Sequence, residues 1–425
     1  MTLVAAAAER SATDFASVRR GSDSSTDAFA RAVLGIVAEP GDGVLGRLIL
    51  ALGASTVGEL LLARASSQRL VDAVAEAGAD LDEREAMAGL ERWLPRLEHG
   101  EFVRSLAQAV RVGARFVVPG DPWWPVGMDE LGAHAPIGLW VRGRPEALAS
   151  DLPSIALVGA RAATGYGEHV AMEAAAGLVD RGFAIVSGGA YGIDGMAHRA
   201  ALASHGTTVA FLAGGVDRFY PLGHESLLAR IVETGAVAAE LPCGAAPTKW
   251  RFLQRNRLIA AASEATVVLE AGVRSGSLNT AGHAAALGRP VGAVPGPVTS
   301  PASAGCHRLL REFDAVCVVD ADQMAELVDR GVRRRFGATV RPGEEASEDP
   351  VVSDAGVVPP AAPNAEEPQV VRVLDALSTR SPREIDDVAR RAGLTVAEVM
   401  SVLGRLEASG TAERGVRGWR RRRAG

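Results

Sequence analysis

The chain has 425 residues, more than one ordinary hydrophobic core holds, so two or three domains are expected. Apolar residues make up 48% and charged residues 23%, as in soluble globular proteins, whereas aromatic residues make up only 4%. The net charge of −6 does not favour nucleic acid, but the distribution of charge decides that question rather than its sum. Because no apolar stretch approaches the roughly 18 residues of a membrane-spanning helix, we expect a cytoplasmic protein without membrane contact.

Composition and periodicity separate four regions ahead of the C-terminal domain. Residues 1–28 are rich in Ala, Ser and Asp without a period, which predicts a disordered lead. Residues 29–112 carry apolar residues at helical spacing and predict a small all-helical domain of the SAM or helix-hairpin-helix kind. Residues 113–335 predict an α/β core. Residues 336–368 predict an acidic, proline-rich linker with too few apolar residues to form a core.

Within the core, short apolar runs alternate with helical stretches. This order is typical of a mostly parallel sheet covered by helices on both faces, and we expect an extended Rossmann-like fold. The predicted strands are Leu139–Gly143, Ser154–Val158, Phe183–Ser187, Thr207–Leu212, Ala236–Glu240, Ala265–Leu269, Val291–Val294 and Ala315–Val319.

Residues 369–425 regain helical periodicity. One helix begins near Val370, and Ser381–Glu384 resembles a capping box at the start of a second. Thr395–Ala408 predicts a third helix, and Thr411–Arg423 a two-stranded wing. Three helices and a wing indicate a winged helix.

Two loops that follow predicted strands are rich in glycine. Gly159 allows a close backbone approach to a phosphate, and Arg161 adds a bidentate donor. Ser187-Gly188-Gly189 leads through Gly192 to Asp194 and suggests a nest of backbone N–H groups. The alternatives are an ordinary glycine after a strand and a tight turn with Asp194 as N-cap.

Two further segments carry groups suited to a nucleic acid strand. Lys249–Arg257 packs four cations and two aromatic side chains into nine residues, and Lys249 is the sole lysine of the chain. Aromatic rings stack bases while cations contact phosphates, although a solvated basic helix start is the alternative. Ser275-Gly276-Ser277 opens the helix after Glu270, either as an anion site or as plain N-capping. Because ligands bind at the carboxyl ends of parallel strands, the four segments together predict a groove for a polynucleotide.

In order and spacing, these motifs resemble the DprA/Smf family (DNA-processing protein A). The resemblance spans residues 115–325 and implies a Rossmann-like core that binds single-stranded DNA without a cofactor or turnover. It also implies a homodimer that loads RecA recombinase onto DNA during natural transformation. The matching motifs are Val158-Gly159-Ala160-Arg161, Ser187–Asp194, Arg255–Ala260, Glu270-Ala271 with Ser275–Leu278, and Val294-Pro295-Gly296.

Loop chemistry and resemblance together assign DNA contact to thirteen residues: Gly159, Arg161, Ser187, Gly188, Gly189, Lys249, Phe252, Arg255, Asn256, Arg257, Ser275, Gly276 and Ser277. Ala160 departs from the Ser or Thr usual in the family, so one hydroxyl contact to phosphate is missing. The family often has Gly or Asn before Phe252 and Pro after it, which leaves the roles of Trp250 and Arg251 open.

Two other functions are alternatives for this sequence. A nucleotide hydrolase of the lysine-decarboxylase-like kind would need a Pro-Gly-Gly-x-Gly-Thr loop, which the sequence lacks, although Glu240 and Glu270 could act as bases in principle. A transcription regulator would read duplex DNA through the winged helix, which could equally contact protein; its wing is rich in arginine, but the third helix offers only Arg405. The three cysteines show no zinc spacing and His198 has no ligand partner, so no metal and no catalytic residue are expected.

Overall fold

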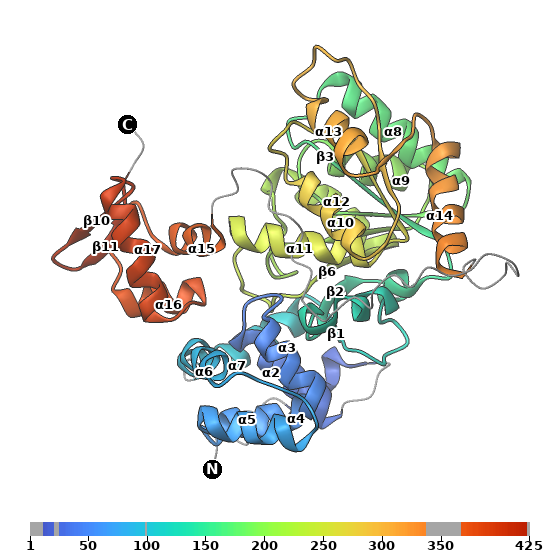
Figure 1. Cartoon of the computed structure of the whole chain (residues 1–425). Coiled ribbons are helices and arrows are strands. Elements are labelled where there is room, and N and C mark those ends of the chain that lie inside the picture. Colours follow the sequence, from blue (N-terminus) through green and yellow to red (C-terminus); the bar gives the residue numbers. More distant parts are fainter. Residues whose placement is uncertain (1–11, 21–24, 98–99, 337–366, 423–425) are drawn as a thin grey trace, which may run out of the picture.

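The computed structural model describes residues 12–20, 25–97, 100–336 and 367–422, with side chains omitted over 330–336. Six helices, α2 to α7, and a short helical segment at residues 12–18 form the N-terminal helical region, a nine-stranded sheet with its helices forms the core, and a winged helix lies beside the core (Figure 1). The expected α/β core with a helical N-terminal domain and a C-terminal winged helix is therefore confirmed. The expected linker falls largely on 337–366, outside the described residues.

The helical domain packs around its own apolar cluster, which includes Leu45, Leu48, Leu70 and Trp93. Asp42 helps to shape it, because its carboxylate accepts hydrogen bonds from Val44 N and Leu45 N and from the Trp93 indole. The helices are α2 (Thr26–Val37), α3 (Gly43–Leu52), α4 (Ala54–Leu62), α5 (Ser67–Glu76), α6 (Glu83–Leu97) and α7 (Glu101–Arg111).

The lead predicted to be disordered over residues 1–28 differs from the structure where the structure describes it. Residues 12–18 are helical, and Phe15 and Val18 are buried. Arg19 is also buried, where it pairs with Asp121 and donates to Phe116 O at 2.8 Å. Local composition could not reveal this, because the partners lie about a hundred positions away. Residues 1–11 and 21–24 lie outside the described residues.

The core sheet has the strand order β1-β2-β6-β5-β4-β3-β7-β8-β9, in which β1, β2 and β6 pair antiparallel and the rest pair parallel. The strands are β1 (Arg115–Val117), β2 (Leu139–Gly143), β3 (Ser154–Gly159), β4 (Ala184–Ser187), β5 (Thr208–Phe211), β6 (Ala236–Ala239), β7 (Ala265–Glu270), β8 (Val291–Ala293) and β9 (Val316–Cys317). Each predicted strand is present, and its ends lie within two residues of the predicted ends.

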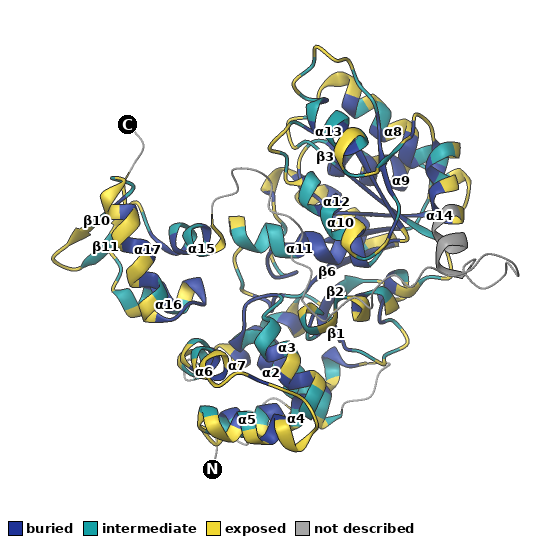
Figure 2. Ribbon diagram, in the orientation of Figure 1, coloured by how far each residue is buried: buried dark blue, intermediate teal, exposed yellow. Residues whose placement is uncertain are grey.

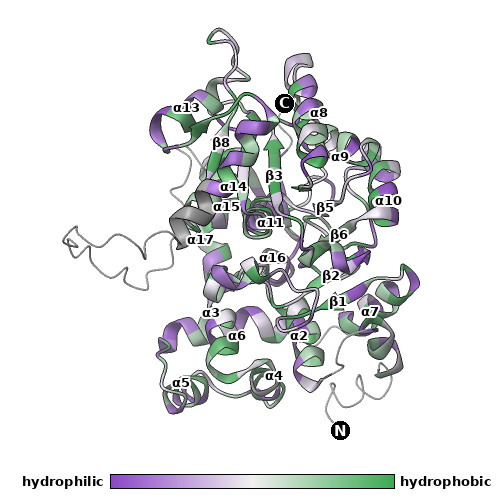
Figure 3. Cartoon of the chain, turned by 90° about the vertical axis from the view of Figure 1, so that its right-hand side faces the viewer, coloured by the Kyte–Doolittle hydropathy of each residue, from purple (hydrophilic) through white to green (hydrophobic). Residues whose placement is uncertain are grey.

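Alternate side chains of the central strands enter cores on opposite faces of the sheet. Ile155 and Leu157 of β3 pack against α8 (Gly165–Asp180), α9 (Ile193–Ala203) and α14 (Ala321–Phe336). Ala156 and Val158 pack against α11 (Lys249–Ala261), α12 (Ser277–Ala286) and α13 (Ala304–Glu312) on the other face. The strands are therefore buried on both sides, as Figure 2 shows, and β3 is hydrophobic along its length in Figure 3.

The antiparallel part of the sheet is covered by helices from both the core and the helical domain. The helix α10 (Glu225–Thr234) packs with α2 and α7 on the β1-β2-β6 part of the sheet, where Phe102 and Trp140 are buried. The remaining elements of the core are the 3₁₀ segments η1 (Val126–His134), η2 (Pro145–Ala149) and η3 (Leu222–His224).

The winged helix packs around Val388, Val399, Val402 and Leu403. Its second helix lacks the capping box expected at Ser381–Glu384; a capping box is present at Thr395 and Glu398 instead, where both reciprocal bonds form. Its elements are α15 (Pro368–Ala376), α16 (Ile385–Ala392), α17 (Val396–Ala408), β10 (Ala412–Gly415) and β11 (Gly418–Arg421).

Candidate nucleic-acid interface

The strand order reverses between β3 and β7. After β3 the chain proceeds through β4 to β5 and β6 on one side, whereas β7, β8 and β9 extend the other side. Crossovers in opposite directions leave an opening between the loops that follow these two strands, which is where open α/β sheets bind ligands. We call the loops after β3, β4, β5 and β7, together with the start of α11, the carboxyl edge.

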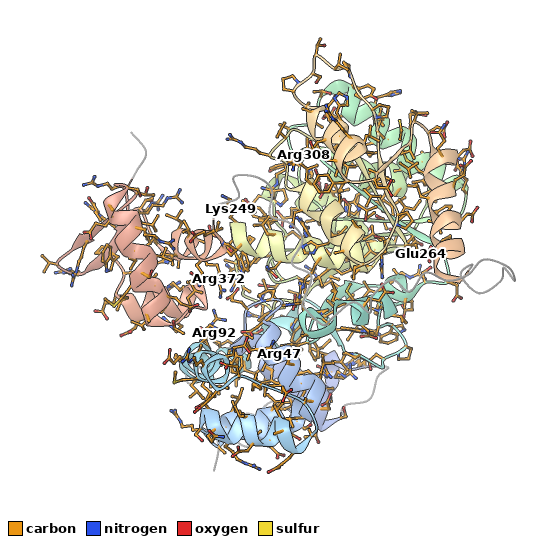
Figure 4. All side chains as sticks on the ribbon, viewed as in Figure 1. Arg47, Arg92, Lys249, Glu264, Arg308 and Arg372 are labelled. Atoms are coloured by element: carbon orange, nitrogen blue, oxygen red, sulfur yellow. The ribbon has the colours of Figure 1, made fainter. Side chains whose placement is uncertain are left out.

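A cation–aromatic stack lies at the carboxyl edge. The guanidinium carbon of Arg161, from the loop after β3, lies 4.5 Å from the ring centroid of Phe252 on α11. Arg255 approaches the same ring at 5.6 Å, and the ring of Tyr220 lies 5.7 Å from it. Arg161 is exposed and Phe252 half-buried, so a charged group and an aromatic ring are presented together. Lys249 is exposed at the first turn of α11 (Figure 4).

Arg255 holds three loops in place. It is 5% exposed, and its Nη1 donates to Gly188 O at 2.6 Å and to Phe211 O at 2.5 Å, at the ends of β4 and β5. Its Nε donates to Asn256 Oδ1, and Asn256 Nδ2 donates to Gly276 O in the loop after β7. Burial lowers the Arg255 pKa to about 10 against the effect of Asp194, so the side chain stays charged at neutral pH. Arg255 and Asn256 therefore position the edge.

The loop after β4 is built around Arg255. A Cβ at Gly188 would lie 2.3 Å from Arg255 Nη1, so only glycine allows this close approach. Asp194 accepts from Gly188 N and Ala190 N, and burial raises its pKa against the opposing charge of Arg255. Gly189 has φ +66°, in the left-handed region. Ser187 is fully buried and donates to Leu157 O at 2.6 Å, so its hydroxyl faces the sheet.

The loop after β7 is the more open of the glycine loops. Gly276 is exposed, and a Cβ there would meet no atom within 4 Å. Ser275 Oγ and Ser277 Oγ are 2.7 Å apart, and Ser277 is the first residue of α12. Two hydroxyls at a helix N-terminus suit an anion.

Gly159 and Arg257 serve packing. A Cβ at Gly159 would lie 2.5 Å from the Ile193 side chain, because α9 crosses closely there. Arg257 is 3% exposed, and its Nη2 donates to both oxygens of Glu240 at 2.7 and 2.8 Å. Its Nε donates to His134 O, so Arg257 ties β6 to η1 and not to the other edge residues.

The two carboxylates considered as bases are both engaged. Glu240 holds Arg257, and Glu270 accepts from Thr164 N at 2.8 Å and from Thr164 Oγ1 at 2.6 Å. His198 is fully buried, and its Nδ1 lies 2.7 Å from Thr208 Oγ1. Burial lowers the His198 pKa to about 3, with His224 and Arg255 adding to the effect, so the ring is neutral. Glu240, Glu270 and His198 therefore hold loops and core elements in place through these hydrogen bonds.

Comparison with known proteins assigns the family. The sequence profile of DNA recombination-mediator protein A matches residues 115–329, and that of the DprA winged helix domain matches residues 357–415. The chain belongs to the DprA/Smf family.

A Mycobacterium tuberculosis chain named DprA is 47% identical over 78% of this chain and 82% of its own length. The Escherichia coli protein Smf is 36% identical over 65% and 69%. The solved structure of DNA processing protein A from Streptococcus pneumoniae is 27% identical, with a TM-score of 0.56 over 71% of this chain and 97% of that one. Membership of the DprA family makes this chain a DNA processing protein.

Sequence reasoning missed one group of residues in this DprA-family chain. All three tyrosines of the chain, Tyr166, Tyr191 and Tyr220, are between 43% and 47% exposed. Tyr220 neighbours Phe252, and Tyr191 packs edge-on against His224 at 4.8 Å. Three tyrosines in so aromatic-poor a chain were a usable signal in the sequence, but only the folded structure shows that they are exposed and brings Tyr220 to Phe252.

Within the described ranges, no group of three or more His, Cys, Asp or Glu side chains could hold a metal ion. In that same part of the chain, no single helix is long and apolar enough to cross a membrane. The helices α3 and α4 together meet the length and composition criteria, but they are bent by 113°.

Proposed function

We propose that this chain binds single-stranded DNA along its carboxyl edge, without catalysing a reaction on it. Arg161, Lys249 and the Ser275–Ser277 loop contact phosphates, and Phe252 stacks a base. The observation that carries this is the exposed Arg161 guanidinium beside the Phe252 ring, since a phosphate donor next to a stacking surface matches the repeating unit of a nucleic acid strand.

The other predicted residues do not contact the DNA themselves but hold the loops that do. Arg255 and Asn256 keep the loops after β4, β5 and β7 at fixed separations, and Gly188 and Gly189 make the turn that accepts Arg255. The remaining three, Gly159, Ser187 and Arg257, hold the strands and helices beneath the edge. Preorganised loops lower the entropy lost when a flexible strand binds.

The proposal extends to partners. Two copies of the chain act as a homodimer and load RecA recombinase onto the bound strand in the cytoplasm; this part rests on family membership. The winged helix adds a contact to duplex DNA or protein through its wing rather than through α17. On that helix, Arg405 pairs with Glu367, whereas the wing presents Arg414 and Arg417 around the exposed Val416.

Anisotropy of labelled single-stranded and duplex oligonucleotides, measured with the full chain across a salt series, tests the DNA proposal. Tighter binding of the single strand is expected at every salt concentration, with a slope of about −0.7 per phosphate contact. Arg161→Ala should weaken binding, while Arg47→Ala, at a surface pair with Glu85 in the helical domain, should leave it unchanged (Figure 4). Equal affinity for both oligonucleotides, or full affinity in both Arg161→Ala and Arg255→Ala, would refute the proposal.

A further inference from the structure

A cavity of about 800 Å³ lies where the helical domain, the core and the winged helix meet. Its wall includes Glu39 and Arg96 from the helical domain, Trp250 and Arg251 from α11, and Arg372 from α15. Figure 4 labels Arg372 on the winged helix, near the end of α11 that carries Lys249. The cavity thus adjoins the first turn of α11, but none of the thirteen residues predicted to contact DNA lines it.

The wall of this cavity is strongly basic. Nine arginines and four carboxylates line it, an excess of five positive charges in a chain whose net charge is −6. Three of the carboxylates are already engaged. Glu39 pairs with two arginines, Asp375 accepts from Trp250 N at 3.0 Å, and Asp217 accepts from Gly244 N at 2.8 Å. Asp217 also lies 3.8 Å from Arg218, and Asp387, just outside the wall, pairs with Arg383, Arg390 and Arg391. Even when Asp387 is counted, the nine arginines outnumber the carboxylates, so the cavity keeps a net positive charge.

Buried groups fix the inner part of the wall. Arg96 Nη2 lies 2.7 Å and Arg251 Nη2 2.8 Å from Glu39 Oε1. Arg372 donates to the carbonyls of Ala392 and Gly393, and its guanidinium lies 5.5 Å from the Trp250 ring. Burial lowers the Arg372 pKa, and the charges of Arg96 and Arg92 lower it further against the effect of Glu39. Three guanidinium groups thus surround one carboxylate.

The inner wall also includes a buried hydrogen-bond donor without an acceptor in the described part of the chain. Trp250 Nε1 is buried and has no hydrogen-bond partner among the described residues. A buried N–H that makes no hydrogen bond destabilises the protein, and an anionic oxygen would accept a hydrogen bond from it. At the opening of the cavity, Arg104 and Arg111 of α7 and Arg218 of the loop after β5 are exposed.

We propose that this three-domain cavity is a second anion site, which binds phosphate groups through its arginines. Its volume lies within the roughly 300–1,000 Å³ typical of small-ligand sites, and guanidinium groups favour phosphate because they donate two parallel hydrogen bonds. The phosphates come either from a polynucleotide backbone that passes the start of α11 or from a free nucleotide or polyphosphate. Because all three domains supply cations, a bound phosphate also holds the winged helix against the core.

Calorimetric titration of the full chain with inorganic tripolyphosphate tests the site. The Arg161→Ala variant is titrated as well, so that phosphate bound at the carboxyl edge is not counted. We expect saturable tripolyphosphate binding in the wild type and in Arg161→Ala. The double variant Arg104→Glu/Arg111→Glu should weaken the affinity roughly tenfold, because it removes two ion contacts. Arg218→Glu, on a different element, should also weaken it. Arg84→Glu, an exposed change on α6 away from the cavity wall, should not.

Competition then identifies the source of the phosphate. Displacement of tripolyphosphate by a single-stranded oligonucleotide assigns the cavity to a polynucleotide backbone, and failure to displace it assigns the cavity to a small phosphate. Absence of saturable binding, or equal affinity in the wild type, Arg104→Glu/Arg111→Glu and Arg218→Glu, overturns the proposal. This test of the cavity is independent of the proposed DNA site at the carboxyl edge. If Arg161→Ala lost single-stranded DNA binding but still bound tripolyphosphate, the cavity proposal would stand.

Discussion

The guanidinium of Arg161 lies 4.5 Å above the ring of Phe252, although the two residues are 91 positions apart, Arg161 in the loop after β3 and Phe252 on α11. The ring fixes a guanidinium that would otherwise sample many rotamers at an exposed position. Phe252 itself is half-buried, so part of its side chain remains accessible. Contact with DNA at this edge should therefore depend on both residues jointly.

Phe252→Ala should weaken single-stranded DNA binding by about 1–3 kcal/mol, because it removes a stacking surface and releases Arg161. Phe252→Tyr keeps the ring and should bind nearly as well as the wild type. Anisotropy at one fixed salt concentration measures both, with circular dichroism to verify folding. Equal affinity in Phe252→Ala and the wild type would exclude base stacking at this ring.

Arg161→Lys separates the contribution of the positive charge from that of the planar guanidinium group. The ammonium retains the phosphate attraction, so the slope of affinity against salt should stay near its wild-type value. Affinity itself should fall, because lysine can neither stack flat on Phe252 nor donate two parallel bonds. Arg161→Ala should lower the slope by about 1. If both variants had the same slope, Arg161 would not be a phosphate contact.

Gly188→Ala should destabilise the protein by about 1–3 kcal/mol, because the new methyl group would lie 2.3 Å from Arg255 Nη1 and push it from the carbonyls it holds. Gly276→Ala is the matched control in another loop of the same edge, since nothing lies within 4 Å of its Cβ position and its φ is −63°. Urea unfolding compares the two variants. A larger loss of stability in Gly276→Ala would contradict the role assigned to Arg255.

Glu39→Gln should destabilise the junction of the domains by about 3–5 kcal/mol, because Arg96 and Arg251 would lose a buried counter-charge. Glu85→Gln, at an exposed pair with Arg47, should cost less than about 1 kcal/mol. The urea midpoint of the first unfolding transition at neutral pH reports both changes.

The same carboxylate predicts a pH dependence. Burial would raise the Glu39 pKa, but the charges of Arg251 and Arg96 outweigh it and hold the pKa well below its usual 4.5. A lowered pKa in the folded state stabilises the protein above the unfolded value, and that stability is lost as pH falls below about 4.5. The difference between wild type and Glu39→Gln should therefore shrink in acid; a difference that grows in acid would contradict this assignment.

The family motifs and the strand–helix order could be recognised without a structure, because they depend on neighbours in the chain. Buried runs such as Ser154–Val158 have the two-sided apolar pattern of parallel strands, and a glycine loop after such a strand is a local feature. The starts of helices were harder to predict from the sequence. A capping box was expected at Ser381 but is present at Thr395, because many pairs of Ser or Thr with Glu satisfy the sequence pattern.

The fold class, the family and the candidate residues of the carboxyl edge follow from the amino-acid sequence alone. How those candidates divide follows from folding: Arg161 and Lys249 are exposed, whereas Arg255 and Arg257 turn inward to carbonyls and to Glu240. The role of an arginine depends on which acceptors surround it, and those acceptors come from distant strands. The same holds for Arg19, Tyr220 and the basic cavity, each formed by residues that meet only after folding.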